Sequence, residues 1–395
     1  MGKGITYPEG FYASGINCGI KEGKNDLSLI YSKTSCISSG TFTTNQFKSY
    51  SVLWSIKNIK NEIRAVLINS GNANACNGKE NWNLTKRIIE ELAEKLKIEK
   101  NSVLFASTGI IGVPLPYEKI KNGLDKLIQK LSKEGNSEAV KGIMTTDTFP
   151  KEYEINTKIE GRKKQVVIGG MAKGSGMINP SMATMLCFIT TDAVIDKKAL
   201  DIALKEAVED SFNMITIDND TSTNDTVICL ANGLARNKTI HLDTPEFNVF
   251  SDSLKNLCIE LAKKIASDGE GAKKLIEVYV CGGWCKKDVR KVAKKVCGSS
   301  LVKTAISGGD PNWGRIVAAV GSTNARIDIN STEVKICGIK VFEGEPVKFD
   351  KELLKELMKK REIKIEINLK RGKFSATSWG CDLTEEYVKI NKEYS

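Results

Sequence analysis

The sequence predicts an α/β protein built from mixed β-sheets layered with helices. Strand-like apolar runs alternate along the chain with helix-like segments and follow no strict βαβ period, so a barrel is not favoured. No repeats, low-complexity tracts or Pro/Ser-rich linkers interrupt this alternation. With 395 residues, 41% of them hydrophobic, the chain can form two or three domains or one large α/β body.

The predicted strands are short apolar runs that end at turn-forming residues. The first run ends in the turn-rich segment Asn69–Gly78, and the second leads into Ser107–Gly112. Near the C-terminus, isoleucines alternate with polar residues, which predicts an edge or half-buried strand. The set is Ile63–Ile68, Val103–Ala106, Val166–Gly170, Leu186–Thr190, Val227–Leu230, Leu275–Tyr279 and Ile363–Leu369.

Helices are predicted where apolar residues recur at helical spacing. The densest basic stretch, Lys286–Lys295, places valines at that spacing, which indicates an amphipathic helix with a solvated basic face. The net charge of +11 is as compatible with attraction of small anionic substrates as with nucleic-acid binding. The predicted helices are Trp82–Leu96, Tyr117–Leu131, Lys197–Ser211, Phe250–Ser267 and Val289–Val296.

The single histidine, His241, restricts the possible chemistry. A Ser-His-Asp or Cys-His set could use only this residue, and a zinc site with two imidazoles cannot form within one chain. The polar residues around His241 predict a surface or strand-edge position. Acid–base chemistry near neutral pH must therefore come mostly from a shifted lysine, cysteine or carboxylate, or from an α-amine.

The cysteine pattern and the N-terminal residues predict a cytoplasmic protein. Eleven scattered cysteines argue against a complete disulfide framework. Cys281 and Cys285 lie four positions apart without a second close pair, so we expect reduced, buried thiols and no metal. No apolar run approaches the roughly 18 residues of a membrane-spanning helix, and the N-terminus carries no secretory signal.

The most unusual segment is Gly169–Leu186, with four glycines, one lysine and three hydroxyl residues between two predicted strands. A phosphate-binding loop requires Gly-Lys-Ser/Thr before a helix, whereas here Lys173 precedes Gly174 and a strand follows. A dinucleotide-binding fingerprint lacks its third glycine. Ser175 also lacks the glycine offsets of the Gly-x-Ser-x-Gly nucleophile elbow.

The remaining interpretation is that this segment contains a catalytic nucleophile. Ser181, Ala183 and Thr184 lie at the entry to the strand that follows. The hydroxyl of Thr184 could attack the carbonyl of Ala183, and hydrolysis of the ester would free an α-amine with a pKa of about 8. Such an amine is a built-in general base for the neighbouring hydroxyl. The alternative is a strand threonine that merely packs in the core.

This segment resembles the signature of the ornithine acetyltransferases, the glutamate N-acetyltransferases of arginine biosynthesis. The resemblance rests on Gly-Gly-Met-Ala-Lys-Gly-Ser-Gly-Met-Ile-x-Pro-x-Met-Ala-Thr-Met-Leu at 169–186. Further motifs of the same family follow in order along nearly the full chain. They include Ser-Gly-Asn-Ala-Asn-Ala-Cys-Asn-Gly (70–78), Ser-Thr-Gly-Ile-Ile-Gly (107–112), Met-Thr-Thr-Asp-Thr-Phe-Pro-Lys (144–151), Asp-Asn-Asp-Thr-Ser-Thr-Asn-Asp (218–225), Gly-Glu-Gly-Ala (269–272) and Gly-Asp-Pro-Asn-Trp-Gly-Arg (309–315).

The resemblance implies a precursor that cuts itself between Ala183 and Thr184. The α chain, 1–183, would carry the oxyanion hole and the glycine-rich loop, and the β chain, 184–395, would begin with the nucleophile. This is a self-cleaved, N-terminal-nucleophile-like architecture. Thr184 would serve as nucleophile and, through its α-amine, as base in a ping-pong transfer of acetyl from N2-acetyl-L-ornithine to L-glutamate.

The resemblance also assigns roles to individual residues. Thr108 and Gly109 match the oxyanion hole, where a hydroxyl and a backbone N–H stabilise the tetrahedral intermediate. Lys173 would hold a substrate carboxylate, and Glu270 an amino cation of ornithine. The C-terminal residue is less well matched, because the tail is one residue shorter than the family pattern. The implied substrate-binding residues are Thr146 (with Thr145 as the alternative), Lys173, Thr184, Glu270, Asn391 and Ser395.

Several alternatives remain open at the sequence level. A bifunctional relative would also acetylate glutamate from acetyl-CoA, and a self-cleaved amidohydrolase or aminopeptidase would release its acyl group to water. A basic nucleic-acid-binding protein is a rival of another class. Ser300 and Lys303 have the Ser-x-x-Lys spacing, but without Lys-Thr-Gly they are interpreted as packing residues. The family implies a heterotetramer of two α and two β chains, without a cofactor, nucleic-acid partner or membrane.

Overall fold

The computed structural model describes residues 2–161, 164–179 and 185–392. The chain divides into two compact units. Unit 1 comprises 1–174, 181–209 and 221–261, and unit 2 comprises 175–180, 210–220 and 262–395. Each unit combines helices with one β-sheet of mixed strand directions, which confirms the predicted α/β class.

The sheet of unit 1 is arranged around one long strand, β2. The first part of β2 pairs antiparallel with β1 and β3, and its last residues pair antiparallel with β9. Two neighbouring pairs, β3 with β4 and β7 with β9, are parallel. The order is β4 (Val103–Ile110), β3 (Ile63–Asn72), β2 (Leu27–Phe42), β9 (Thr226–Ala231), β7 (Leu186–Thr191), β6 (Gln165–Lys173) and β5 (Lys151–Glu160), with β1 (Phe11–Ile16) beside β2.

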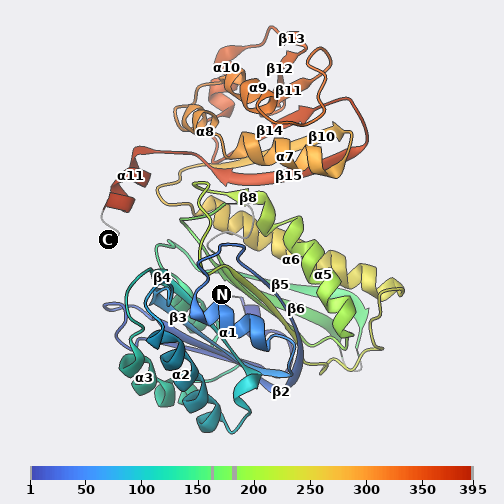
Figure 1. Cartoon of the computed structure of the whole chain (residues 1–395). Helices are drawn as coiled ribbons and strands as arrows, with labels where there is room; N and C mark the ends of the chain where they lie inside the picture. The colour runs from blue at the N-terminus through green and yellow to red at the C-terminus, as the bar shows by residue number, and fades with distance from the viewer. Residues whose placement is uncertain (1, 162–163, 180–184, 393–395) are drawn as a thin grey trace. The chain divides into compact units, whose positions relative to one another are not determined.

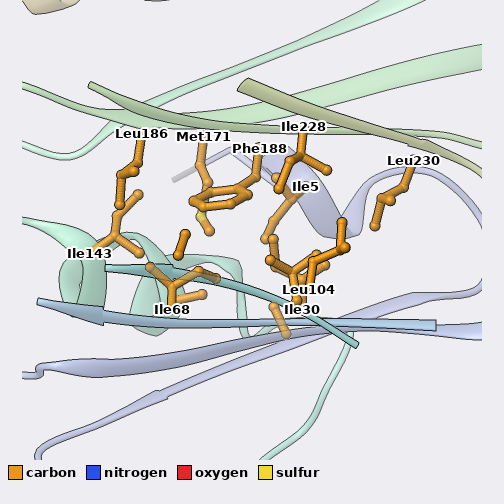
Figure 2. Close-up of a cluster of buried hydrophobic side chains, with 14 of the residues drawn as sticks. Ile5, Ile30, Ile68, Leu104, Ile143, Met171, Leu186, Phe188, Ile228 and Leu230 are labelled. Carbon is orange, nitrogen blue, oxygen red and sulfur yellow. The ribbon is translucent and has the colours of Figure 1, made fainter. Parts of the chain in front are cut away.

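The main core of unit 1 lies between the two halves of this sheet. Figure 2 shows side chains of β6, β7 and β9 facing those of β2, β3 and β4 across an apolar layer. Because successive side chains of a strand point to opposite faces, Val66 and Ile68 enter this layer, while Ala65 and Leu67 face the opposite side. Phe188 of β7 is 1% exposed within the layer.

Helices cover the outer faces of both halves (Figure 1). Apolar residues of α1 (Tyr50–Asn58), α2 (Glu80–Leu96) and α3 (Tyr117–Gln129) form a second core with β3 and β4. On the other face, α5 (Lys197–Glu209) packs against β2, and α6 (Pro245–Ser267) places leucines against β6. The α4 helix (Asn136–Ile143) contributes its apolar side to the layer between the strands.

Unit 2 contains a seven-stranded sheet. Its order is β13 (Glu345–Pro346), β12 (Ile339–Glu343), β11 (Glu333–Ile336), β14 (Glu362–Asn368), β10 (Leu275–Gly283), β15 (Phe374–Cys381) and β8 (Ile215–Thr216). The α7 helix packs against β10 and β15 with its valines buried and its lysines facing solvent, as its spacing predicted. The helices are α7 (Lys286–Cys297), α8 (Ser300–Ser307), α9 (Trp313–Gly321), α10 (Lys351–Leu357) and α11 (Glu385–Lys392).

Short 3-10 helices complete the regular structure at Gly4–Thr6, Lys100–Ser102 and Phe212–Met214. Within the described part of the chain, no helix combines the length and apolar character needed to cross a membrane.

The structure extends several predicted strands at their C-terminal ends, including β6 to Lys173 and β10 to Gly283. β3 continues to Asn72 and β4 to Ile110, so the expected turns begin later. The prediction for β3 and β4 failed because it ended each strand at its first polar residues, whereas Ser107 and Thr108 are buried within β4.

Three other expectations have different outcomes. The strand predicted as Ile363–Leu369 is not at an edge, because β14 lies between β11 and β10; its alternation reflects one buried face. Cys281 and Cys285 are half-buried rather than buried.

His241 is confirmed at the surface: its side chain is 60% exposed, and its Nδ1 lies 2.7 Å from Asp196 Oδ2.

The packing between the sheet halves yields a stability prediction. Phe188→Ala removes a large side chain from the apolar layer, and it should lower the free energy of unfolding by about 3–5 kcal/mol. Phe47→Ala is the matched control, because Phe47 is 70% exposed. Urea denaturation of the two variants would contradict this account of the core if their midpoints shifted equally.

Candidate active site

Strand ends from both halves of the unit 1 sheet meet around Lys173. Lys173 ends β6 and pairs with Leu186 at the start of β7, which pairs in turn with Thr226 at the start of β9. From the other half of the sheet, Thr108 of β4 approaches the same place: Lys173 Nζ lies 3.4 Å from Thr108 Oγ1. Both side chains are 3% exposed. The structure thus brings together two residues that the motifs singled out separately.

A buried asparagine ties these strand ends together. Asn224, two residues before β9, donates from Nδ2 to the carbonyl of Ser107 at 2.8 Å and to that of Ala73 at 2.6 Å. Because both acceptors belong to the β3–β4 side, this side chain connects the two halves of the sheet beside Thr108.

Gly109 occupies a backbone position that excludes a side chain. Its φ is +134°, which favours glycine. An added Cβ would also lie 2.3 Å from Gly71 C and 2.5 Å from Asn72 N, where the register of β3 and β4 shifts. Glycine therefore lets the backbones of β3 and β4 approach closely next to the Thr108 hydroxyl.

A buried carboxylate, Asp147, organises the cations near Thr108. Its Oδ1 lies 2.6 Å from Lys151 Nζ, and both side chains are fully buried. The same oxygen accepts the Gly174 N–H at 2.8 Å, while Oδ2 accepts the Thr145 N–H at 3.0 Å. Lys173 Nζ lies 4.0 Å from Oδ2. Asp147 thus fixes the loop before β5 to the end of β6.

The protonation state of Asp147 follows from its neighbours. Burial acts to raise the pKa of this carboxyl, but Lys173, Lys151 and the hydrogen bonds outweigh burial and hold the pKa well below its usual range. Asp147 is therefore ionised at neutral pH and offsets the buried ammonium groups. Thr145 and Thr146 directly precede it and are half-buried, so both positions lie at this cluster.

The described chain resumes at Met185, beside a second buried carboxyl. The Met185 N–H donates to Asp225 Oδ1 at 3.0 Å, while Asp225 Oδ2 has no hydrogen-bond partner among the described residues. Burial raises the pKa of the Asp225 carboxyl well above its usual range. Thr184 and Ala183, the predicted nucleophile and cleavage site, lie outside the described residues.

Two predicted substrate-binding residues contact each other in unit 2. Asn391 of α11 donates from Nδ2 to Glu270 Oε2 at 2.8 Å. The Glu270 N–H donates to the Ser175 carbonyl at 2.8 Å, which fixes the backbone of Glu270. Ser395 lies outside the described residues.

The Ser-x-x-Lys spacing does not form a catalytic pair. Ser300 is exposed at the start of α8, whereas Lys303 is 2% exposed and donates to the Ile217 carbonyl at 2.7 Å. The interpretation as packing residues is confirmed for Lys303, whereas Ser300 lies at the surface. Over the described ranges, no group of three or more His, Cys, Asp or Glu side chains is arranged to hold a metal ion.

Several residues of this site were missed at the sequence level. Asp147 and Lys151 lie in the motif at 144–151, and Asn224 and Asp225 end the motif at 218–225. The motifs mark these segments, but only the fold shows that the four side chains are buried beside the ends of β4, β6 and β7.

The chain is similar to proteins of known family over nearly its full length. A model of the ArgJ family matches residues 12–395. The arginine biosynthesis bifunctional protein ArgJ of Caldanaerobacter subterraneus subsp. tengcongensis is 48% identical over 396 residues, covering 99% of this chain and 98% of that protein. ArgJ 1 of Clostridium acetobutylicum is 46% identical, covering 99% and 97%.

A solved structure of an ArgJ protein is also similar to this chain. The arginine biosynthesis bifunctional protein ArgJ from Bacillus halodurans aligns with a TM-score of 0.51 at 44% identity, covering 52% of this chain and 98% of that chain. Together with the sequence matches, this similarity confirms the resemblance drawn from the ordered motifs.

The buried pair at Asp147 yields a prediction with a defined pH dependence. Asp147→Asn removes the charge that pairs with Lys151 and should lower the free energy of unfolding by about 3–5 kcal/mol at pH 7. Because the folded-state pKa of Asp147 is depressed, its contribution is complete above the unfolded-state pKa and is lost as the pH falls through the folded value. The difference from wild type should therefore shrink below about pH 4.

Chemical denaturation at pH 7 and pH 3 measures this difference. Asp125→Asn is the control, because the Asp125 side chain is 67% exposed and pairs with Lys95 at the surface. If the difference in unfolding free energy between Asp147→Asn and wild type were the same at both pH values, the charge pairing could not be its cause.

Proposed function

The chain belongs to the ArgJ family, and from this premise we propose that it transfers acetyl from N2-acetyl-L-ornithine to L-glutamate. The expectation of an enzyme of this family is confirmed by its relatives, which are named as arginine biosynthesis proteins. The observation that carries the specific reaction is the meeting of Thr108 and Lys173 where the chain enters β7. The Thr108 hydroxyl can donate a hydrogen bond to the carbonyl oxygen of an acetyl group. The buried Lys173 ammonium group can bind the carboxylate of the amino acid that carries this acetyl group.

The first proposed step is self-cleavage before Thr184. The Thr184 hydroxyl attacks the Ala183 carbonyl carbon, the C–N bond breaks, and the liberated nitrogen takes up a proton to become an α-amine. Water then hydrolyses the Ala183 ester, which regenerates the hydroxyl. The Bacillus halodurans chain supports this step: it is covered to 98% while matching 52% of this chain, so it has about the length that one cleavage product would have.

The mature site would then run two half-reactions. The α-amine of Thr184 accepts the hydroxyl proton as the oxygen attacks the acetyl carbonyl of N2-acetylornithine. Thr108 and the Gly109 backbone stabilise the oxyanion, the ornithine α-amine leaves with a proton, and acetyl remains as an ester on Thr184. The α-amine of glutamate attacks this ester, and N-acetylglutamate leaves as the hydroxyl is restored.

Substrate recognition is proposed to follow charge. Lys173 and Thr146 would hold the α-carboxylate, since a buried ammonium group prefers an anionic partner. Glu270 would receive an amino cation of ornithine, with Asn391 and Ser395 completing the contacts. No cofactor is required, and the products of cleavage, 1–183 and 184–395, would assemble in the cytoplasm as an α2β2 heterotetramer.

A bifunctional enzyme is the second candidate. The curated relatives are named bifunctional at 48% and 46% identity, which favours acetyl-CoA as an additional donor to glutamate. Separate assays with N2-acetylornithine and with acetyl-CoA distinguish the two candidates. Release of acetate without glutamate would instead indicate an amidohydrolase.

Self-cleavage is tested by intact mass spectrometry. Wild type should give two chains, 1–183 and 184–395, whereas Thr184→Ala should remain one chain because it lacks the attacking hydroxyl. His241→Ala is the control and should be cleaved and active, since the mechanism uses no imidazole. A wild-type protein that stays uncut while transferring acetyl would exclude this mechanism.

The oxyanion role predicts a selective loss of turnover. Thr108→Val keeps the shape of the side chain but removes its hydroxyl, so kcat should fall by about 10²–10³-fold. Thr157→Val is a control of the same type, because the buried Thr157 hydroxyl donates to the Val166 carbonyl at the opposite end of β6 from Lys173. Steady-state assays on cleaved protein measure both variants, and an unchanged kcat in Thr108→Val would remove Thr108 from the oxyanion hole.

A further inference from the structure

The loop between β1 and β2 is held rigidly by one buried carboxylate. Asp26 is fully buried and accepts the backbone N–H groups of Cys18 at 2.7 Å, Ile20 at 2.7 Å and Lys21 at 2.9 Å. These three bonds fix the backbone of Lys21. The direction in which this lysine leaves the loop is therefore built into the fold.

The side chain of Lys21 runs from this loop to the site at Thr145 and Thr146. Its stem crosses Gly71, where an added Cβ would lie 3.0 Å from Lys21 Cγ. The φ of Gly71 is +96°, a second reason for glycine at this position. Lys21 Nζ then donates to the Met144 carbonyl at 2.6 Å, directly before Thr145. This neutral carbonyl is its hydrogen-bond partner among the described residues.

The charges around Lys21 do not balance. Lys151 and Lys173 lie next to Asp147, whose oxygens are already engaged by Lys151 and by backbone N–H groups. The charges of Asp147 and Lys173 both act on Lys21. Asp26 is likewise engaged by three N–H groups, and Lys24 adds a further positive charge in the same loop. The half-buried Lys21 ammonium thus has a positive surplus around it, which favours an anionic ligand.

The two substrates differ in the number of carboxylate groups that they carry. N2-acetylornithine carries one carboxylate, and its side chain ends in an ammonium group. Glutamate carries the same α-carboxylate and a second one at the end of its side chain. Lys173 and Thr146 are already assigned to the α-carboxylate that both substrates carry. A further cation beside them therefore matches a second carboxylate, which only the acceptor has.

We propose that Lys21 is a specificity-determining residue that binds the side-chain carboxylate of glutamate. The inference rests on the proposed acetyl transfer and deepens it by separating acceptor recognition from donor recognition. In a ping-pong cycle, kcat/KM for each substrate reports only its own half-reaction. Lys21 should therefore influence the glutamate half-reaction alone.

Lys21→Met, which keeps the stem and removes the charge, tests the proposal. The kcat/KM for glutamate should fall by about 10- to 100-fold, as expected for a charge-assisted hydrogen bond, with most of the effect in KM. The kcat/KM for N2-acetylornithine should stay within about twofold of wild type. Lys33→Met is the control, because Lys33 is an exposed lysine of β2 outside this loop, and it should leave both values near wild type.

The pH dependence gives an independent readout. Burial, together with Lys24 and Lys173, lowers the pKa of Lys21 to about 8, while Asp26 and Asp147 act in the opposite direction. Wild-type Lys21 therefore loses its charge as the pH rises through about 8, and the defect of Lys21→Met relative to wild type should shrink there. Lys21→Arg should stay charged and keep its preference for glutamate at high pH.

The outcomes separate this inference from the proposed function. Wild type without acetyl transfer would reject the proposed function itself. Active wild type with equal losses for both substrates in Lys21→Met, or with no loss at all, would overturn the role of Lys21. If Lys21→Met does not fold or is not cleaved, the wild-type and Lys21→Arg pH profiles decide, and identical profiles count against the proposal.

Discussion

Strand β2 is the constraint on which unit 1 depends. Because it pairs with β3 through its first part and with β9 through its last residues, the two halves of the sheet cannot shift independently. The apolar layer between them fixes their separation, and Asn224 fixes the register at one end. The approach of Thr108 to Lys173 is therefore a property of the whole sheet, and not of the two loops beside it.

The chemistry at this end of the sheet is dominated by the cost of burying charge. Lys151 and Lys173 are tolerated in the interior because Asp147 provides a negative charge and backbone N–H groups complete its hydrogen bonds. Asp225 has no ion pair among the described residues, and burial raises its pKa although Lys173 acts to lower it. The same fold thus keeps one carboxyl ionised and favours the neutral form of the other, on either side of the entry to β7.

The sequence predicted the continuous apolar strands such as β7 and β9, which are buried on both faces, and the amphipathic helices, which bury one face. It did not predict β1, β2, β5 or β15, in which polar residues interrupt the apolar ones. It misjudged β4, whose buried Ser107 and Thr108 look like the start of a turn. For the site, the motifs identified Thr108, Gly109 and Lys173 through resemblance. Asp147 was missed, because a charged residue inside a polar motif gives no sign of burial until strands distant in sequence are brought together.

The pairing of β6 with β7 has a consequence for how this protein can be made. β6 precedes the proposed cleavage site and β7 follows it, yet the two are neighbours in one sheet. As a precursor, the chain forms this pairing within a single molecule. After cleavage, a denatured enzyme would have to find its other fragment by diffusion, so its recovery would depend on protein concentration. The two strands would then pair rapidly only in the uncleaved precursor. The lifetime of the cleaved enzyme would depend on how slowly it unfolds.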